Sequence, residues 1–250
     1  MGTLQCHPFP VVAWFDRVVA LSFAFPEEAL RSFVPDGLEM DTYEGHGFLT
    51  VAMVWTRHLR PAGFPEALGQ DFFLAGYRVF TRLNDGGRRL RGLRILRSET
   101  DKRRMVTLGN LMTGYRYRHV NVAITENDGL IRVATALPDG VQTLDTTFSH
   151  QDEEPGLPEN SPFPDWRTAR RFAGPMPFTF STEGDGSFVV IEGSRETWTP
   201  RPIRVDHWKV GMFDEPPLKD FTPRLANAFM VENVAYRWEK GRIARPGGEA

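Results

Sequence analysis

The feature that most constrains the fold of this chain is an alternation of side-chain type with a period of two residues. Within Arg17–Phe25, bulky apolar residues such as Leu21 and Phe23 alternate with small ones such as Ala20 and Ser22. Because successive side chains of a β-strand point to opposite faces, this pattern predicts a strand. The same pattern recurs in Phe48–Trp55, Val120–Thr125, Leu130–Leu137, Phe188–Glu192 and Asn233–Trp238.

Turn signals separate these runs, and helical signals are few. Asn127-Asp128-Gly129 lies between two alternating runs and predicts a β-hairpin. A helix is predicted over Pro26–Phe33, which has proline and acids in its first turn and is followed by a proline–glycine terminator. Shorter helical turns are expected within 65–69 and 219–230. We therefore predict a mainly β (α+β) fold of antiparallel strands, arranged as a barrel or a sandwich.

Length and composition place these strands in one domain. The chain has 250 residues, of which 41% are apolar and 25% are charged, as in ordinary globular proteins. We expect residues 1–250 to form a single domain, because the strands on either side of residue 150 are too few for two closed barrels. The acidic, proline-rich segment 150–165 is expected to be an exposed excursion.

Charge and hydrophobicity exclude several classes of partner. The formal net charge is −2, and the arginine-rich stretch 88–104 lacks a recognition motif, so we interpret it as the solvated face of a strand. No apolar run approaches the ~20 residues of a membrane-spanning helix. The sequence begins without the features of a signal peptide. We expect a cytoplasmic protein that binds neither nucleic acid nor membrane, and we leave homo-oligomer formation open.

The chain offers little for metal, cofactor or nucleophile chemistry. Its one cysteine, Cys6, excludes an intrachain disulfide. The six histidines show neither an HxH nor an HExxH pattern, which leaves only a spatial cluster of His119 or His207 with Glu192. Nucleophile-elbow and phosphate-loop motifs are missing from the sequence. We therefore expect no metal and no cofactor.

Several motifs, taken in order, resemble one known family. Residues 25–55 resemble its usual opening, a helix that ends in Val-Pro-x-Gly-Leu-Glu, and then Asp-Thr-Tyr-Glu-Gly before an apolar strand. Over residues 11–240 the chain resembles the YqjF-like family of unknown function, in the acetoacetate decarboxylase-like superfamily. The resemblance implies a curved, largely antiparallel sheet that closes into a cone or barrel around a central cavity, with a few helices outside. The further matching segments are Arg60–Pro65, Tyr77–Arg82, Gly114–Arg118, Glu192 with Arg195, and Asp206–Trp208.

The resemblance raises the question of decarboxylase chemistry. True acetoacetate decarboxylases use a lysine whose amine pKa is depressed by a neighbouring lysine, so that the neutral amine attacks the ketone and forms an imine. An alignment of Leu108–Arg118 by its glycines places Tyr117 and Arg118 at the two lysine positions. The nearest lysine, Lys102, is interpreted as part of a solvated turn. We therefore expect no imine by the family route, and we leave open whether the protein is an enzyme.

The segment Tyr115–Arg118 carries the candidate binding groups. In a strand, its two tyrosines would point to one side and its two arginines to the other. An arginine in the cavity could hold a carboxylate bidentately while a tyrosine hydroxyl orients or protonates the ligand. Alternatively, the arginines lie on the surface, or an internal pair such as Arg78 with Glu192 only stabilises the fold. The candidate ligand-binding residues are Arg78, Tyr115, Arg116, Tyr117, Arg118, Glu192 and Arg195, and Tyr117 is the candidate catalytic residue.

Three functions fit this sequence. The first is binding of a small organic ligand, a carboxylate or carbonyl compound, in the cavity and without an imine-forming lysine. The second is an enzyme that acts on a keto or hydroxy acid by acid–base chemistry that needs no imine. The third is a structural or interaction protein whose barrel is filled by side chains. The presence of a cavity would separate the first two from the third.

Overall fold

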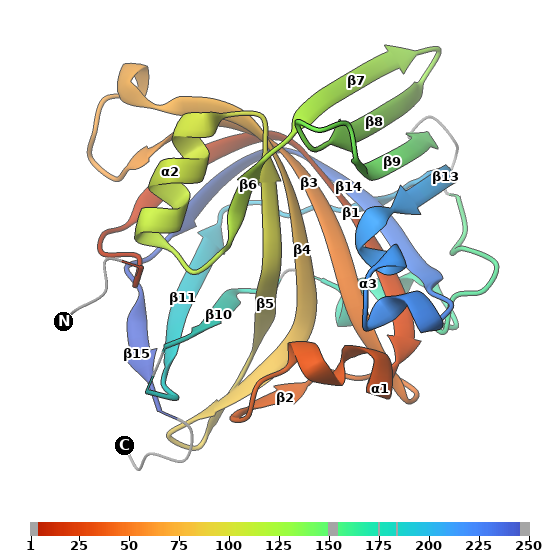
Figure 1. Ribbon diagram of the computed structural model, residues 1–250, viewed down its shortest axis with the longest axis horizontal. Helices are drawn as coiled ribbons and strands as arrows, with labels where there is room; N and C mark the ends of the chain where they lie inside the picture. Colours follow the sequence, from red (N-terminus) through yellow and green to blue (C-terminus); the bar gives the residue numbers. More distant parts are fainter. Residues whose placement is uncertain (1–4, 150–154, 175, 184, 246–250) are drawn as a thin grey trace.

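Long strands dominate the fold. The computed structural model describes residues 5–149, 155–174, 176–183 and 185–245. The strands of greatest length run side by side in one large sheet (Figure 1): β1 (Val11–Pro26), β3 (His46–Pro61), β4 (Gln70–Asp85), β5 (Arg88–Thr100) and β14 (Arg224–Trp238). Its shorter strands are β2 (Leu38–Met40), β6 (Tyr117–His119), β10 (Phe178–Thr182), β11 (Phe188–Arg195), β12 (Arg201–Pro202) and β15 (Arg242–Ala244). A second sheet contains β7 (Asn121–Asn127), β8 (Leu130–Ala136), β9 (Gln142–Ser149) and β13 (Arg204–Val210).

The large sheet curves until its two sides meet. Its described strands follow the order β12-β14-β1-β3-β4-β5-β10-β11-β15, with β2 on β4 and β6 on β5. Strand β11 also pairs with β14, where Gly193–Arg195 lies opposite Tyr236–Trp238, so the pairings close into a ring. Figure 1 shows the strands converging at one end and spreading at the other. The predicted mainly β fold with a curved sheet is confirmed, as a cone rather than a strict barrel, and β6 and β10 pair with β5 in parallel.

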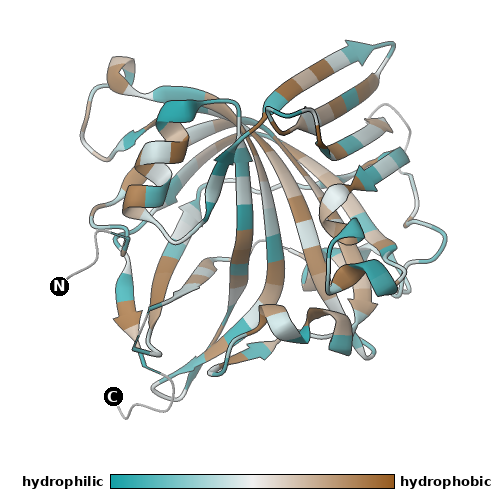
Figure 2. Cartoon of the chain, in the orientation of Figure 1, coloured by the Kyte–Doolittle hydropathy of each residue, from teal (hydrophilic) through white to brown (hydrophobic). Residues whose placement is uncertain are grey.

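Period-two alternation gives each long strand two buried faces. On β1, Leu21 and Phe23 belong to the main hydrophobic core, on the outer face of the cone. Ala20, which precedes Leu21, and Ser22, which lies between Leu21 and Phe23, are also buried, but they face the inside of the cone. Bulky side chains therefore fill the outer core, while small ones leave space inside. Figure 2 shows hydrophobic residues along the middle of these strands and hydrophilic residues at the β4–β5 turn.

The second sheet covers the outer face of the cone. Ile131 of β8 and Leu144 of β9 belong to the same core as the outward-facing residues of β1, β3 and β4. The predicted hairpin joins β7 to β8, with φ angles of 49° at Asp128 and 79° at Gly129. Positive φ at both central residues is what a type I′ turn requires. The hairpin prediction is confirmed, and the hairpin belongs to the covering sheet and not to the cone.

The described residues form three α-helices: α1 (Glu27–Leu30), α2 (Arg103–Met112) and α3 (Trp166–Phe172). The predicted helix over Pro26–Phe33 corresponds to α1 and the 3₁₀ turn that follows it. Helix α2 was not predicted, because it begins with two arginines, which are unfavourable at the positive end of a helix. The solvated turn expected around Lys102 is its N-terminal boundary. Within the described ranges, no helix has the length and hydropathy needed to cross a membrane.

One predicted element is of the wrong type. Helical turns were expected within 219–230, but only Leu218–Asp220 forms a 3₁₀ turn, and β14 begins at Arg224. The run Ala226–Val231 is buried on both faces of the sheet. It therefore lacks the polar positions by which an alternating strand is recognised. The turn expected within 65–69 is present as the 3₁₀ helix Glu66–Leu68.

An aromatic cluster anchors part of the acidic segment 150–165. Residues 150–154 lie outside the described residues. In the remainder, Phe163 is only 4% exposed, and its ring centroid lies 5.4 Å from that of Phe48 and 5.6 Å from that of Phe172. The same cluster contains Phe80 and Met176, which line the inside of the cone. This part of the segment therefore helps to close one end of the cone.

A buried carboxylate joins the two sheets. Glu99 of β5 is fully buried and accepts hydrogen bonds from the Tyr77 hydroxyl at 3.0 Å and the Thr143 hydroxyl at 2.8 Å. The guanidinium of Arg118, on β6, donates to it through Nε at 2.9 Å and through Nη2. Tyr77 and Arg118 belong to the cone, whereas Thr143 belongs to the covering sheet. This network therefore fixes the position of the covering sheet and of β6.

We predict that the Arg118→Met variant loses stability, because it leaves the Glu99 carboxylate buried without its cation. The expected loss is about 3 kcal/mol of unfolding free energy, toward the lower end for a broken buried pair, because Arg118 keeps 28% exposure. Urea denaturation followed by circular dichroism measures it. The matched control is Arg89→Met, which breaks the exposed pair with Glu39 and should change stability far less. Equal losses in the two variants would contradict this role of Glu99.

Candidate functional site

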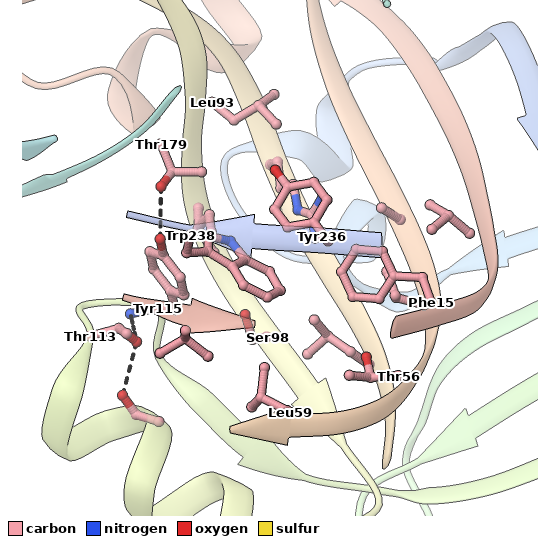
Figure 3. Close-up of a pocket in the computed structure, with 18 of the residues that line it drawn as sticks. Phe15, Thr56, Leu59, Leu93, Ser98, Thr113, Tyr115, Thr179, Tyr236 and Trp238 are labelled. Carbon is pink, nitrogen blue, oxygen red and sulfur yellow. Dashed lines mark hydrogen bonds between the residues drawn. The ribbon is translucent and has the colours of Figure 1, made fainter. Parts of the chain in front are cut away.

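A cavity occupies the inside of the cone. Its volume is about 290 Å³, and its wall comes from the inner faces of β1, β3, β4 and β5, from β11 and β14, and from helix α2. Figure 3 shows Leu93 at one end, Thr56 and Leu59 at the other, and Tyr236 and Trp238 between them. A barrel filled by side chains, the third function considered above, does not fit this cavity.

A row of polar residues crosses the inner face of four neighbouring strands. Arg78 of β4 lies opposite Thr50 of β3, Thr50 opposite Ser22 of β1, and Ser22 opposite Asn227 of β14. The hydroxyls of Ser22 and Thr50 form a hydrogen bond of 2.5 Å. The Asn227 amide is fully buried and finds no hydrogen-bond partner in the described part of the chain. Since buried polar groups are normally paired, this row is an unusual polar band on the inner face, between apolar Phe80 and Leu93 on one side and Gly76 and Ala52 on the other.

Arg78 is a cation without a counter-ion. Arg78 is half-buried, its Nε is buried without a hydrogen-bond partner, and none of the described residues forms an ion pair with it. Gly76 makes room for the guanidinium, because a Cβ there would lie 2.9 Å from both Nε and Nη2 of Arg78. Burial lowers the pKa of Arg78, but a guanidinium keeps its charge near neutral pH. Arg78 therefore presents an uncompensated positive charge to the cavity that it lines.

Three tyrosines surround this cation. Tyr115, Tyr117 and Tyr236 line the cavity, and each lies close enough to Arg78 to act on its charge. The Tyr115 hydroxyl is hydrogen-bonded to Thr179 at 2.7 Å (Figure 3), whereas the Tyr117 hydroxyl has no such partner among the described residues. Burial raises the pKa of Tyr117 to about 12 and also raises the pKa values of Tyr115 and Tyr236. At pH 7 these neutral hydroxyls can donate a hydrogen bond or a proton but cannot act as bases.

Helix α2 positions Tyr117. The Tyr117 N–H donates to Oδ1 of Asn110 at 2.7 Å, and Nδ2 of Asn110 donates to the Tyr117 carbonyl at 2.8 Å. Gly109 lies against the Tyr117 ring, where a Cβ would overlap the ring carbons. Arg116 has a φ of 52°, so the regular strand begins only at Tyr117. Both tyrosines nevertheless line the cavity, on the same side as predicted.

A second arginine borders the same cavity. The guanidinium of Arg195 lies over the Trp198 ring, 4.9 Å from its centroid, and 5.7 Å from the centroid of the Tyr236 ring. Burial lowers the pKa of Arg195, and no carboxylate pairs with it within the described ranges. The Arg195 guanidinium is therefore held by cation–π contacts with these two rings and not by a carboxylate. The wall near Tyr236 therefore carries further positive charge.

Two other titratable side chains line the cavity and are engaged by backbone. Arg60 donates to the carbonyl oxygens of Phe64 at 3.0 Å and His58 at 2.9 Å. The Nδ1 atom of His7 lies 3.0 Å from the carbonyl oxygen of Glu239, and burial lowers the pKa of His7. Two N–H groups of Arg60 are therefore hydrogen-bonded to its own loop. Because its pKa is lowered, His7 is neutral at pH 7.

The lining contains arginines but neither acids nor lysines. Among the described residues that form the wall, Arg60, Arg78 and Arg195 are basic, and none is aspartate, glutamate or lysine. Lys102 lies at the boundary of α2, with its side chain 53% exposed and 3.1 Å from Asp101. The electrostatics of the cavity therefore favour an anion.

Three of the candidate residues lie outside the cavity lining. Arg116 is exposed, and Arg118 points to the outer face, where it pairs with Glu99. Glu192 is exposed, because alternation along β11 turns Arg195 inward and Glu192 outward. The structural pair of Arg78 with Glu192 is therefore not formed. In the described part of the chain, no three His, Cys, Asp or Glu side chains are grouped to hold a metal ion, so the cluster of His119 or His207 with Glu192 is not found there.

The sequence did not single out several residues of the wall. Tyr236 and Trp238 lie in a run that was predicted as a strand, and their aromatic side chains at alternate positions were an available signal. The polar row was not recognisable, because Thr50 and Ser22 meet Arg78 only through strand register. Register between distant strands follows from tertiary packing.

Comparison with known proteins identifies the family. The sequence model of DUF2071, described as an uncharacterized conserved protein, matches residues 13–233. The chain belongs to this family. Comparison with curated proteins gives no significant match.

Solved structures with the same fold come from the acetoacetate decarboxylase-like group. Acetoacetate decarboxylase from Legionella pneumophila aligns with a TM-score of 0.65 at 9% identity, over 96% of this chain and 89% of that one. The enduracididine biosynthesis enzyme MppR, complexed with the condensation product of pyruvate and imidazole 4-carboxaldehyde, aligns with a TM-score of 0.65 at 14% identity, over 96% and 91%. An acetoacetate decarboxylase-like enzyme from Sphingomonas wittichii RW1 aligns with a TM-score of 0.60 at 11% identity, over 97% and 94%. At these identities the likeness concerns the fold alone.

We predict that Gly109→Ala destabilises the protein although it improves the helix. Alanine is a better helix former than glycine by about 1 kcal/mol, but its Cβ would press on the Tyr117 ring. The expected net loss is about 1–3 kcal/mol of unfolding free energy, measured by urea denaturation. Thr107→Ala, at an exposed position of the same helix, is the control and should be neutral or stabilising. A gain in stability in both variants would show that the helix does not confine Tyr117.

Proposed function

We propose that this protein binds a small organic carboxylate in the cavity, with Arg78 as the anion-binding group. The observation that carries the proposal is that Arg78 lines the cavity as a largely buried cation with no counter-ion among the described residues. A buried charge without a partner costs several kcal/mol. A carboxylate would offset that cost through bidentate, charge-assisted hydrogen bonds.

The groups around Arg78 support the same ligand class. The Tyr117 hydroxyl is neutral, and in the described structure it is available to donate a hydrogen bond to the ligand. Arg195 adds a second positive charge, and the lining contributes no carboxylate that would repel an anion. Two cations and a neutral donor around one space favour a carboxylate over a neutral carbonyl compound or an amine.

We infer further that the ligand is held without an imine. The cavity wall has no lysine among its described residues, and Tyr117 occupies a wall position on β6 that the alignment assigns to a decarboxylase lysine. A tyrosine hydroxyl cannot form an imine, and an arginine is not a nucleophile at neutral pH. MppR has been solved in complex with pyruvate, which supports a carboxylate ligand for this fold.

We predict that Arg78→Met removes carboxylate binding. Loss of a buried charge partner should weaken binding at least about 30-fold, measured by isothermal titration calorimetry with a panel that contains pyruvate, benzoate and hexanoate. Stability should be unchanged or higher, because the variant also removes an unpaired buried cation. Arg116→Met, an exposed arginine, is the control. Unchanged affinity for every bound member of the panel in Arg78→Met would refute the proposal.

A second candidate function is supported by the free hydroxyl of Tyr117. A keto acid whose carboxylate lies on Arg78 would place its carbonyl oxygen close to the cluster of tyrosines around that cation. Tyr117, with a pKa of about 12, could donate a hydrogen bond or a proton to that oxygen as negative charge develops there. This would make the protein an enzyme acting on a keto or hydroxy acid by acid–base chemistry.

We predict that no imine is trapped. Incubation of the protein with pyruvate or acetoacetate and borohydride should leave its intact mass unchanged, because an imine needs a neutral amine within the cavity. In a separate experiment without borohydride, proton NMR measures whether the protein converts the same keto acids. Turnover that disappears in Tyr117→Phe but persists in Tyr115→Phe would establish the second candidate function. A mass increase that maps to a lysine would overturn the imine-free proposal.

A further inference from the structure

The inner face of the cone changes character along its strands. Arg78 and the polar row lie at one level, and the next level is formed by small residues, Gly76 and Ala52. Beyond them the wall is apolar: Leu74, Val54 and Val18 lie side by side, followed by Phe72 and Phe15 on either side of Thr56. From Arg78 to Phe72 the wall spans six residues of β4, roughly 20 Å at the rise of a β-strand. The cation therefore has a short apolar group, Phe80 and Leu93, on one side and this longer apolar stretch on the other.

Helix α2 supplies an adaptable wall to the same cavity. Met105, Leu108 and Met112 line it from one face of the helix, at the i, i+3 and i+7 positions. Methionine side chains are flexible and polarizable, so they adapt to apolar groups of different shape. Figure 3 places Leu59 at the end of the cavity away from Leu93, on the side where the helix lies. The apolar part of the wall is therefore built to contact a hydrophobic group.

The cavity is larger than a short keto acid requires. A volume of about 290 Å³ corresponds to the liquid volume of about ten water molecules. It accommodates a ligand of roughly ten or more nonhydrogen atoms. A ligand the size of pyruvate would satisfy Arg78 and leave most of the apolar wall without contacts.

The other titratable groups of the described lining do not form a second anion site. The Nε and Nη1 groups of Arg60 donate to the carbonyl oxygens of Phe64 and His58. His7 is held neutral by burial, with its Nδ1 on a backbone carbonyl. Arg195 lies between the Trp198 and Tyr236 rings. Of the three arginines in the described lining, Arg78 is the one with neither a hydrogen bond nor a ring contact, which favours a single carboxylate on the ligand.

We propose that the ligand is an amphipathic monocarboxylic acid, whose carboxylate binds Arg78 and whose apolar tail extends past Leu74 toward Phe15 and helix α2. This inference rests on the proposed carboxylate function and adds the tail. Medium-chain fatty acids and arylalkanoic acids have this chemistry.

The test is a homologous series of straight-chain acids, from acetate through butanoate, hexanoate and octanoate to decanoate, titrated into the wild-type protein by calorimetry. Affinity should rise about fourfold for each added methylene, because each buries apolar surface. Octanoate should therefore bind on the order of 100-fold more tightly than butanoate. The straight-chain alcohol of each length is the matched control for the carboxylate.

A variant locates the tail. Leu74→Asn places a polar group in the apolar wall and should weaken octanoate binding at least about tenfold, while acetate and butanoate are unaffected. The control is Leu68→Asn, the same change at a residue that is 66% exposed and outside the lining. It should alter the binding of neither octanoate nor the shorter acids. Thermal unfolding shows whether each variant is folded. If Leu74→Asn does not fold, the chain-length series on the wild-type protein still tests the tail.

The outcomes separate the two proposals. If acids bind more tightly than alcohols but affinity does not grow with chain length, the tail is refuted and the carboxylate function stands. If affinity grows with chain length equally for acids and alcohols, the carboxylate function is refuted and the apolar tail site stands. If neither series binds, both are overturned.

Discussion

The long strands of the cone are buried on both faces, and the rest of the structure depends on how that burial is divided. The outer face carries bulky residues such as Leu21 and Phe23, which pack against the covering sheet. The inner face carries small ones such as Ala20, Ala52 and Gly76, which leave a space that side chains do not fill. Hydrophobic burial on the outside stabilises the fold, so the inside is free to bind a ligand.

The two faces of the sheet also differ in whether their buried charges are paired. Glu99, on the outer side, is paired with Arg118 and satisfied by hydroxyl groups from both sheets. Arg78, on the inner side, has no such partner in the described structure. Since each strand alternates, neighbouring residues such as Tyr117 and Arg118 serve opposite faces, one lining the cavity and the other stabilising the fold. The charge network is therefore complete on the outer face, whereas the inner face leaves an unpaired cation, to which the proposed ligand would bind.

The fold is shared with decarboxylase-like proteins, yet the residues that face the cavity set its chemistry. In this family member a tyrosine and arginines line the space, and lysine is missing from the described lining. One fold can host different functions, because function resides in the residues of the site and not in the scaffold. The ligand class proposed for this protein therefore rests on the inner face, where arginines and tyrosines lie among apolar side chains.

Much of the fold was predictable, because period-two alternation is a local property of the sequence. It predicted β1, β3, β7 and β8 with their hairpin, and it predicted that Tyr115 and Tyr117 share a side. It failed where burial is two-sided, as in the first half of β14, and where helix α2 lacks the usual start signals.

For the candidate binding groups, too, some features followed from the sequence and others only from the tertiary structure. By itself the sequence determined the strand pattern, the scarcity of lysine and the residue types available for binding an anion. Only the tertiary structure decided that Arg78 has no counter-ion among the described residues, that Glu99 is buried while Glu192 is exposed, and that Tyr236 lines the cavity. The physical reason is that charge compensation and strand register depend on residues far apart in the chain, which meet only when the sheet closes.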